Sequence, residues 1–287
     1  MNSSSFEKNL LAWYSTAKRD LPWRRTTDPY RILVSEMMLQ QTQVDRVIPK
    51  YKAFLQSFPT VQDLANASAG KVIKLWSGLG YNRRAVKLQE CVKTVVHKHQ
   101  GTFPQTTPEL QELPGIGPYT AAAIMAFAYN QPEIVIDTNI RRVFFRIFLG
   151  EGEKLEKLQE TIAKNVSLEN SRDYHNALMD FGATICTARV PKCESCVFAK
   201  ECVSFKKYSK QEMEEMASRI FKTTQSKFEG SNRYYRSMVL KAVQKKEGIT
   251  VRELKKLLPA DKEAHLLVLQ LVKDKLVVEK EGGIWLP

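Results

Sequence analysis

The chain has 287 residues, of which 43% are hydrophobic and 26% charged, an ordinary globular composition with room for one large or two smaller domains. Its 44 Lys and Arg against 31 Asp and Glu give a net charge of +13, which indicates a polyanionic partner such as nucleic acid, although a merely basic protein has the same excess. The first residues lack the pattern of a signal peptide and the apolar run at 121–129 is far too short to span a bilayer, so we expect a cytoplasmic protein (nucleoid-associated in a bacterium) with no membrane partner.

The first 205 residues are predicted to be helices joined by short turns rich in Pro and Gly. Apolar residues repeat at three- and four-residue steps over residues 28–58, and the next helical stretch begins at a Thr cap and ends at Gly78 and Gly80. Further helices are predicted over residues 82–101, 106–113, 117–130, 137–150 and 175–186. Because β-branched alternation is scarce, the sequence predicts an all-α domain.

The composition changes after Cys202. A polar stretch over residues 204–232 precedes three predicted helices, at residues 233–246, 248–259 and 261–276. Two short strands follow, joined by Glu281-Gly282-Gly283. Three helices and a Gly-turn hairpin resemble a winged-helix module, while a helical stabilising cap is the alternative interpretation.

Four of the five cysteines lie within seventeen residues, as C-x6-C-x2-C-x5-C: Cys186, Cys193, Cys196 and Cys202. Four thiolates suit either structural zinc or an iron–sulfur cluster. Zinc ribbons usually present two separate C-x2-C pairs, and this stretch has one, so the spacing favours iron–sulfur over zinc. Disulfides are unexpected in a reducing cytoplasm, and Cys91 is interpreted as a small core residue.

A glycine turn, "LPGIGPYTAAAIMAF", follows one short predicted helix and opens the next. Gly115 and Gly117 would let a backbone approach closely, and the helix start could hold a phosphate, so the segment reads as a helix-hairpin-helix that grips DNA or as an ordinary turn. About twenty residues later comes Asp137, in "VIDTNIRRVFFRIF", which is either an N-cap or a carboxylate acting on a nucleotide.

Together these motifs resemble the helix-hairpin-helix DNA glycosylase superfamily, in which a catalytic Asp follows the hairpin. The cysteine loop is similar to that of the endonuclease III and MutY branches, which hold a [4Fe–4S] cluster. The segments "LPWRRTTDPYRILVSEMMLQQTQVDRVIPKY" and "LWSGLGYNRRAVKL" resemble the MutY family, which removes adenine opposite 8-oxoguanine, and the match covers about residues 6–205. The resemblance implies double-stranded DNA with mispaired or oxidised bases as partner, bound by a monomer.

The resemblance also implies the roles of individual residues. Glu36, in the apolar run "LVSEMMLQQT", matches the acid that protonates the flipped adenine, a role that a buried position favours. Asp137 matches the carboxylate that stabilises the oxocarbenium-like sugar. Arg24, Leu39, Tyr119 and Asn139 match residues of the adenine pocket, and Gln41 and Tyr81 match residues wedged into the base stack. Because Tyr119 stands where bifunctional relatives carry a Lys, we expect a monofunctional glycosylase without efficient strand cleavage.

Three features depart from the MutY pattern. Thr138 and Asn82 replace a glycine and a tyrosine of the usual motifs, and the roughly eighty residues after Phe205 are too few and too helical for the family's Nudix-like domain. A thymine or uracil mismatch glycosylase on the same scaffold is therefore the alternative function. A non-catalytic DNA-damage-binding protein is a further one, which the presence of both Glu36 and Asp137 disfavours.

The expected fold is thus a two-lobed, all-α glycosylase with a cluster loop and a small C-terminal module. The glycosylase domain is predicted over residues 1–205, with a six-helix lobe at about 21–130 and a cluster lobe from about 1–20 and 131–205. A linker over residues 206–232 and a winged-helix-like domain over 233–287 complete the prediction.

Overall fold

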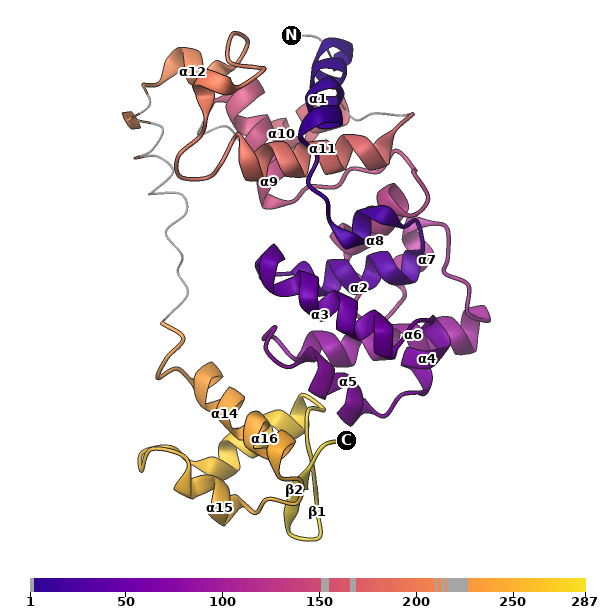
Figure 1. Cartoon of the computed structure of the whole chain (residues 1–287), viewed down its shortest axis with the longest axis vertical. Coiled ribbons are helices and arrows are strands. Elements are labelled where there is room, and N and C mark those ends of the chain that lie inside the picture. Colours follow the sequence, from indigo (N-terminus) through magenta and orange to yellow (C-terminus); the bar gives the residue numbers. More distant parts are fainter. Residues whose placement is uncertain (1–2, 151–154, 166–168, 210, 213–214, 216–226) are drawn as a thin grey trace. The chain divides into compact units, whose positions relative to one another are not determined.

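The structure, a computed structural model, describes residues 3–150, 155–165, 169–209, 211–212, 215 and 227–287 (Figure 1). Its contacts divide the chain into two compact units. Unit 1 comprises residues 1–32, 105–111 and 117–223, and unit 2 comprises residues 33–104, 112–116 and 224–287. Residues 210, 213–214 and 216–226 of the predicted linker lie outside the described residues, and the predicted domain boundaries stay a prediction.

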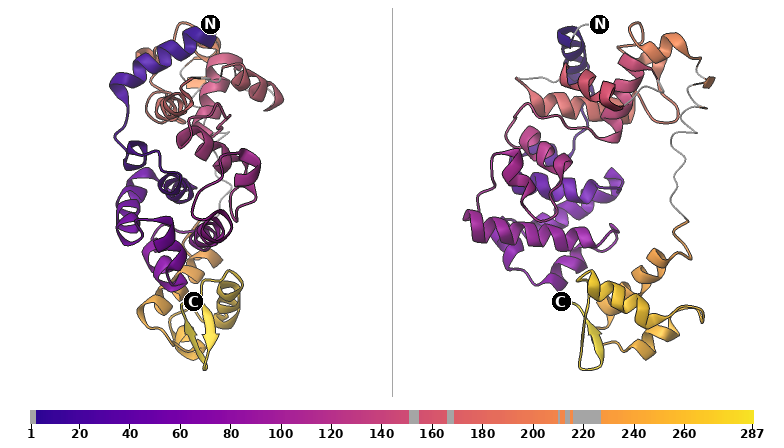
Figure 2. Two further views of the ribbon diagram at one scale, coloured as in Figure 1. Left: turned by 90° about the vertical axis from the view of Figure 1, so that its right-hand side faces the viewer. Right: turned by 180° about the vertical axis from the view of Figure 1, so that it is seen from behind.

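The regular secondary structure of the described chain is helical except for one two-stranded hairpin, which confirms the all-α prediction (Figure 2). The first half contains α1 (Ser3–Ala17), η1 (Pro22–Arg25), α2 (Pro29–Leu39), α3 (Val44–Ser57), α4 (Val61–Asn66), α5 (Ala69–Trp76), α6 (Arg83–His99), α7 (Thr107–Gln111) and α8 (Pro118–Phe127). Then come α9 (Thr138–Phe144), the π-helical turn η2 (Phe145–Leu149), α10 (Leu155–Ala163), α11 (Ser171–Thr184), η3 (Cys193–Ser195) and α12 (Val203–Lys207). The last elements are α14 (Asn232–Lys245), α15 (Val251–Lys256), α16 (Ala264–Lys273), β1 (Val278–Lys280) and β2 (Gly283–Trp285).

Two stretches with continuous helical periodicity are each broken into two helices. Residues 28–58 form α2 and α3, separated by a polar turn in which Gln41 adopts a left-handed φ of 53°. Residues 60–80 form α4 and α5, because Ser68 begins a new helix by accepting a hydrogen bond from the Lys71 N–H. The predicted Thr cap is confirmed: Thr60 forms a capping box with Asp63 at the start of α4.

The core of unit 1 is built by α1, α9, α10 and α11. Phe6 of α1 lies 5.7 Å from Phe144 of α9 and 4.8 Å from Phe198 of the cysteine loop, measured between ring centroids. Phe181 of α11 contacts the other side of Phe198 at 5.3 Å. All four rings are fully buried, so the cysteine loop is anchored by an aromatic side chain in the main core of the unit.

The core of unit 2 is formed by the second half of α2 together with α3, α4, α5 and α6. Trp76 at the end of α5 is fully buried and lies 6.0 Å from the ring of Phe54 in α3. Buried Leu64, Leu88 and Val92 close the space between α4 and α6. Cys91 is buried in α6, as predicted, and burial raises the pKa of its thiol to about 12.

The C-terminal module, residues 227–287, contains the three helices and the antiparallel hairpin that the sequence predicts, with Val278 paired to Trp285 (Figures 1 and 2). Its core includes a residue of the glycosylase helices: Ile73 of α5 is 1% exposed in a cluster with Val243, Leu271 and Leu286. The module therefore packs on α5 rather than standing apart as a separate body within unit 2.

Polar contacts reinforce this packing. The Gly70 N–H, in the first turn of α5, donates to the carbonyl oxygen of Pro287 at 2.7 Å. Lys74 forms an ion pair with Glu247 at 2.7 Å, and Lys275 forms one with Glu90 of α6 at 2.5 Å.

Within the ranges that the structure describes, no helix has both the length and the hydropathy needed to cross a bilayer.

Replacing Ile73 with alanine is expected to lower the free energy of unfolding by about 2–4 kcal/mol, because the cavity would lie between α5 and the module. Chemical denaturation measures the loss. Leu257→Ala is the matched control, since Leu257 is 53% exposed and its truncation should change the value by less than about 0.5 kcal/mol. Equal effects of the two substitutions would contradict the packing.

Candidate functional site

Asp137 and Asn139 lie together at the start of α9 in unit 1. Asp137 is the N-cap: one carboxylate oxygen accepts a hydrogen bond from the Ile140 N–H at 2.6 Å. The other carboxylate oxygen accepts from the side-chain amide of Asn139 at 2.8 Å. Asp137 is therefore the N-cap of α9, and its two donors hold the carboxylate in one orientation. The residue is only partly buried.

Arg142, one turn further along α9, connects this pair to the cysteine loop. Its Nη2 donates to the Asn139 Oδ1 at 2.8 Å and to the Gly182 carbonyl at 2.5 Å, and its Nε donates to the Cys186 carbonyl at 2.7 Å. A side chain at Gly182 would lie 2.6 Å from the Asn139 Cβ, so α11 can approach α9 this closely only with glycine there. A continuous hydrogen-bonded path therefore runs from Cys186 through Arg142 and Asn139 to Asp137.

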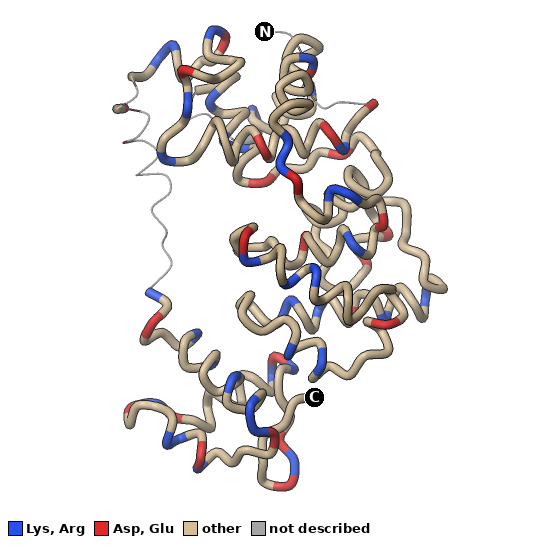
Figure 3. Tube along the Cα trace, viewed as in Figure 1, with Lys and Arg blue, Asp and Glu red and all other residues tan. Residues whose placement is uncertain are grey.

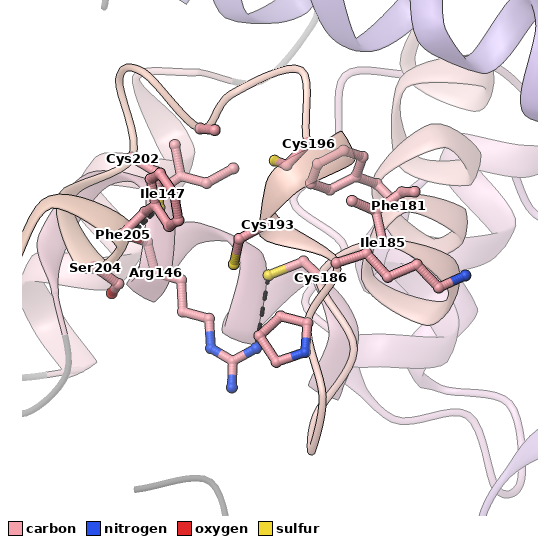
Figure 4. A pocket seen from close by; sticks show the side chains of 13 residues that line it. Arg146, Ile147, Phe181, Ile185, Cys186, Cys193, Cys196, Cys202, Ser204 and Phe205 are labelled. Carbon is pink, nitrogen blue, oxygen red and sulfur yellow. Dashed lines mark hydrogen bonds between the residues drawn. The ribbon is translucent and has the colours of Figure 1, made fainter. Parts of the chain in front are cut away.

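The four predicted ligands line one pocket in unit 1 (Figure 4). None of them forms a disulfide, so all four thiols are available as ligands: Cys186, Cys193, Cys196 and Cys202. Among the described residues, no three His, Cys, Asp or Glu side chains converge closely enough to hold a single metal ion. Four cysteine sulfurs around one pocket suit either a structural zinc ion or an iron–sulfur cluster.

The buried Arg146 holds the main chain at the start of the cysteine loop. Arg146 is 2% exposed and donates to the carbonyls of Thr187 at 2.7 Å and Ala188 at 3.0 Å, while its Nη1 lies 3.8 Å from the Cys186 sulfur (Figure 4). Burial raises the pKa of Cys196 to about 12 and also raises that of Cys202. Cys196 and Cys202 consequently need nearby positive charge to exist as thiolates, the form in which cysteine binds metal.

Arg24 is held by a buried carboxylate in unit 1. Its two terminal nitrogens donate to both oxygens of Asp180, at 2.5 and 2.7 Å, and Arg19 donates to the same carboxylate at 2.5 Å. Burial by itself would raise the pKa of Asp180, but the hydrogen bonds and charges of Arg24 and Arg19 outweigh it and the net pKa is lowered. Arg24 also lines a cavity of about 520 Å³ with other basic side chains, among them Lys18 and Arg172.

His175 of α11 supports the chain just before Asp137. Its Nδ1 lies 2.8 Å from the Ser171 carbonyl and its Nε2 lies 3.4 Å from the Val135 nitrogen, an arrangement that suits the neutral ring with a proton on Nδ1. Burial lowers the pKa of His175 to about 4. The neutral imidazole thus accepts the Val135 N–H and fixes the segment that leads into α9.

Glu36 and Leu39 lie on α2, and Glu36 falls in the half that belongs to unit 2. Glu36 is 7% exposed, between the fully buried Val34 and Met38 on the same helix. Leu39 is the last residue of the helix and is half-buried. Burial of Glu36 agrees with the sequence prediction that it does not lie on a solvated helix face.

Arg84 of α6 fixes the end of this helix. The residue is 9% exposed, and its Nη1 donates to the carbonyls of Met37 at 2.7 Å and Gln40 at 2.5 Å, which lie in the last turn of α2 and just beyond it. Its Nη2 donates to the carbonyl of Gly80 at 3.0 Å. Burial lowers the pKa of Arg84 to about 10, so the side chain remains charged at neutral pH.

Gln41 and Tyr81 occupy the two turns that Arg84 joins. Both are exposed, Tyr81 to 44%, and both have left-handed backbone conformations, with φ of 53° and 46°. Such conformations are unfavourable for residues other than glycine and persist where the surroundings enforce them, often at functional sites. The structure therefore brings together, within unit 2, the two residues predicted to enter the base stack.

The two glycines of the hairpin, Gly115 and Gly117, differ in their surroundings. Gly115 has a φ of +82°, and a side chain there would meet the Lys87 Cβ at 2.9 Å, so its own surroundings require glycine. Gly117, the N-cap of α8, is exposed and has no atom within 4 Å of where its Cβ would lie. Among the described residues, nothing would contact a side chain at position 117, so the space beside the start of α8 is open there. Tyr119 follows on α8 and is half-buried.

Sequence reasoning missed the supporting residues: Arg84, Arg142, Arg146, His175 and Asp180. Each is a common polar residue within an ordinary helical pattern, and its partners lie far away in the sequence or on main-chain carbonyls. The adjacent basic residues in "YNRRAV" and "NIRRVFFR" are a weak signal, since they place arginines inside otherwise apolar helix faces.

Comparison with known proteins identifies the family. Residues 34–167 match the model of the HhH-GPD superfamily of base excision DNA repair proteins. A solved structure of a thermostable thymine-DNA glycosylase matches with a TM-score of 0.67 and 34% identity over 72% of this chain and 97% of that one. The chain belongs to the HhH-GPD superfamily.

Other members of the HhH-GPD superfamily are also similar. The adenine DNA glycosylase of Mycobacterium tuberculosis is 41% identical over 196 residues, which is 66% of this chain and 64% of that protein. The human adenine DNA glycosylase is 40% identical over 213 residues, which is 69% of this chain and 39% of that protein. The chain thus spans less than two thirds of these relatives. A trapped endonuclease III–DNA intermediate, with a TM-score of 0.62 and 23% identity, shares the fold.

Acid should destabilise the protein through His175. Since its pKa falls from an ordinary 6.5 to about 4 in the folded state, the unfolded chain binds the proton first, and stability is lost as pH falls from 6.5 towards 4. The loss is on the order of 3 kcal/mol. Urea unfolding across this range should show a shallower pH dependence for His175→Gln than for the wild type, whereas substitution of the exposed His265 should leave it unchanged. Parallel curves for all three would refute the assignment.

Proposed function

We propose that the protein is a DNA glycosylase of base excision repair that hydrolyses the N-glycosidic bond of adenine paired with 8-oxoguanine or guanine. The observation that carries the proposal is identity of about 40% to adenine DNA glycosylases over about two thirds of this chain. The superfamily match over residues 34–167 includes both Glu36 and Asp137. The net charge of +13 and the open Gly117 at the start of α8 support binding of duplex DNA. The protein is proposed to act as a monomer.

Glu36 acts as the general acid. The adenine must leave the stack before the bond between its N9 and C1′ can be reached, and it leaves poorly as an anion. A proton from the Glu36 carboxyl to N7 of the flipped base makes it a neutral leaving group. The burial of Glu36 supports this role, since a carboxyl in apolar surroundings holds its proton more readily.

Asp137 acts on the sugar. Cleavage of the N9–C1′ bond takes the bonding pair to the base and leaves positive charge on C1′ and the ring oxygen. The Asp137 carboxylate, oriented by Asn139 and the Ile140 N–H, stabilises that charge until water adds to C1′ and loses a proton. The products are free adenine and an abasic site. Asn139 keeps the carboxylate pointing in one direction.

The remaining predicted residues position the DNA. Arg24, Leu39 and Tyr119 are proposed to line the adenine pocket, and Gln41 and Tyr81 to enter the stack that the base has left. Gly115 and Gly117 are proposed to admit the DNA backbone to the N–H groups at the start of α8. Because Tyr119 has no amine, it cannot form a Schiff base with the sugar, and the enzyme is proposed to be monofunctional, without efficient strand cleavage.

The cysteine pocket is proposed to hold a [4Fe–4S] cluster through Cys186, Cys193, Cys196 and Cys202. Support comes from four cysteines that line one pocket and form no disulfide, and from their spacing, which contains a single C-x2-C pair. When bound, the cluster supplies iron–sulfur bonds that fix the loop. Arg142 and Arg146 transmit that rigidity to α9 by holding the Cys186 and Thr187 carbonyls.

Excision of thymine or uracil from mismatches is the second candidate. It is favoured by the similarity to the thermostable thymine-DNA glycosylase, which the chain matches along nearly its whole length. The two candidates share the scaffold but differ in the base released, and Glu36 would need another role if that base were thymine or uracil. Measuring which base is released from defined mismatches separates the two candidates.

Single-turnover base release should be measured on duplexes containing A opposite 8-oxoguanine, A opposite G, T opposite G and U opposite G, with alkali to cleave abasic sites. We expect release of adenine, fastest opposite 8-oxoguanine. Glu36→Gln should slow it by about 10²–10⁴-fold because the acid is lost. Asp137→Asn should slow it by at least about 10²-fold because the sugar cation loses its countercharge.

Two exposed carboxylates give matched controls: Glu156→Gln and Asp45→Asn should excise at the wild-type rate. Release of T or U in place of A would move the protein to the second candidate. Wild-type rates for the Glu36 and Asp137 variants would reject the mechanism.

Cys196→Ser should lose iron and acid-labile sulfide, because one of four ligands is removed. Elemental and sulfide analysis of the purified protein gives the measurement. Cys91→Ala, which removes a thiol from the core of unit 2, should retain both elements at the wild-type level. Stoichiometric zinc without sulfide in the wild type would show that the pocket holds a different metal.

A further inference from the structure

A groove in unit 2 lies between the turns that carry Gln41 and Tyr81 and the C-terminal module. One wall is formed by the glycosylase helices and the other by the module. The aromatic and basic side chains on which the inference rests are Tyr81, Arg83, Lys87, Phe228, Arg233 and Arg236. Its volume is about 650 Å³, within the range of sites that bind small molecules and large enough for a nucleotide.

The groove carries an excess of positive charge. Five of its lining residues are cationic and one, Asp274, is acidic. Asp274 is 12% exposed and is already neutralised, since Arg236 forms an ion pair with it and Arg83 approaches it at 3.4 Å. Lys and Arg recur along α6 and α14, which supply these cations (Figure 3). Such a surface is complementary to a polyanion.

Exposed aromatic rings accompany the charge. Tyr81 is 44% exposed and Phe228 is 53% exposed, and both line the same groove. Phe228 stands against Tyr234 of α14 in an edge-to-face contact at 5.6 Å, which supports its orientation. Basic side chains interleaved with exposed aromatic rings are typical of surfaces that bind nucleic-acid strands, where the cations contact phosphates and the rings stack on bases.

We propose that the C-terminal module forms part of the DNA-binding face, with Arg233 contacting a backbone phosphate of the strand that passes Tyr81. The proposal rests on the proposed function, because it takes Gln41 and Tyr81 as the residues that enter the duplex. The Asp274 ion pairs give the module a defined position against α6, so Arg233 is presented to the same strand as Tyr81. The module is thus a DNA contact as well as a cap on α5.

The test is binding of the full chain to an undamaged duplex at several salt concentrations. Arg233→Gln should reduce the slope of log K against log salt by about 0.9, the value for one lost phosphate contact. Arg233→Lys keeps the charge and should restore the wild-type slope. Arg252→Gln is the matched control: Arg252 is an exposed arginine of the same module that does not line the groove, and its loss should leave the slope unchanged.

The outcomes separate this inference from the proposed reaction. An unchanged slope in Arg233→Gln would overturn the inference and leave the groove to another kind of partner, such as an acidic protein segment. Equal reductions in Arg233→Gln and Arg252→Gln would also overturn it, since they would reflect net charge alone. Because an undamaged duplex offers no base to excise, a reduced slope for Arg233→Gln alone would support the DNA contact even if the wild type released no adenine.

Discussion

The organisation of unit 2 depends on the burial of a single guanidinium group, that of Arg84. The last carbonyls of a helix have no partner within it, and in α2 those of Met37 and Met38 accept hydrogen bonds from Arg84. The same group holds the Gly80 carbonyl, so two turns distant in sequence become one rigid body. The left-handed conformations of Gln41 and Tyr81 persist because this body enforces them. A lysine could not replace Arg84, since an ammonium group lacks the planar set of donors.

Unit 1 uses the same device twice. Arg142 and Arg146 are nearly buried and donate hydrogen bonds to main-chain carbonyls of the cysteine loop. Arg142 adds Asn139, and through it Asp137, to this network. The orientation of the carboxylate and the conformation of the loop are therefore properties of one connected structure. A substitution in the loop should change the position of Asp137 without touching it, because hydrogen bonds and rigid helices transmit the displacement.

Local patterns in the sequence predicted much of this architecture. The all-α class, the Thr60 cap and the C-terminal helices and hairpin follow from periodicity and turn residues, and the shared cysteine pocket follows from ligand spacing. The breaks that separate α2 from α3 and α4 from α5 were not predicted, because helical periodicity continues through both. The arginine network and the packing of Ile73 against the module could not be predicted either, since they join residues far apart in the sequence. The roles of individual site residues rest on resemblance and remain predictions.

The packing of the C-terminal module on α5 bears on how the chain folds during synthesis. Ile73 is buried by residues such as Leu271 and Leu286, about two hundred positions later in the sequence. During synthesis, the apolar side chain of Ile73 therefore stays exposed on α5 until the C-terminal module has been synthesised. Contacts of such high sequence separation form slowly, and the uncovered surface is prone to association in the meantime. Unit 2 can therefore complete its core only after the C-terminal module has been synthesised and has folded.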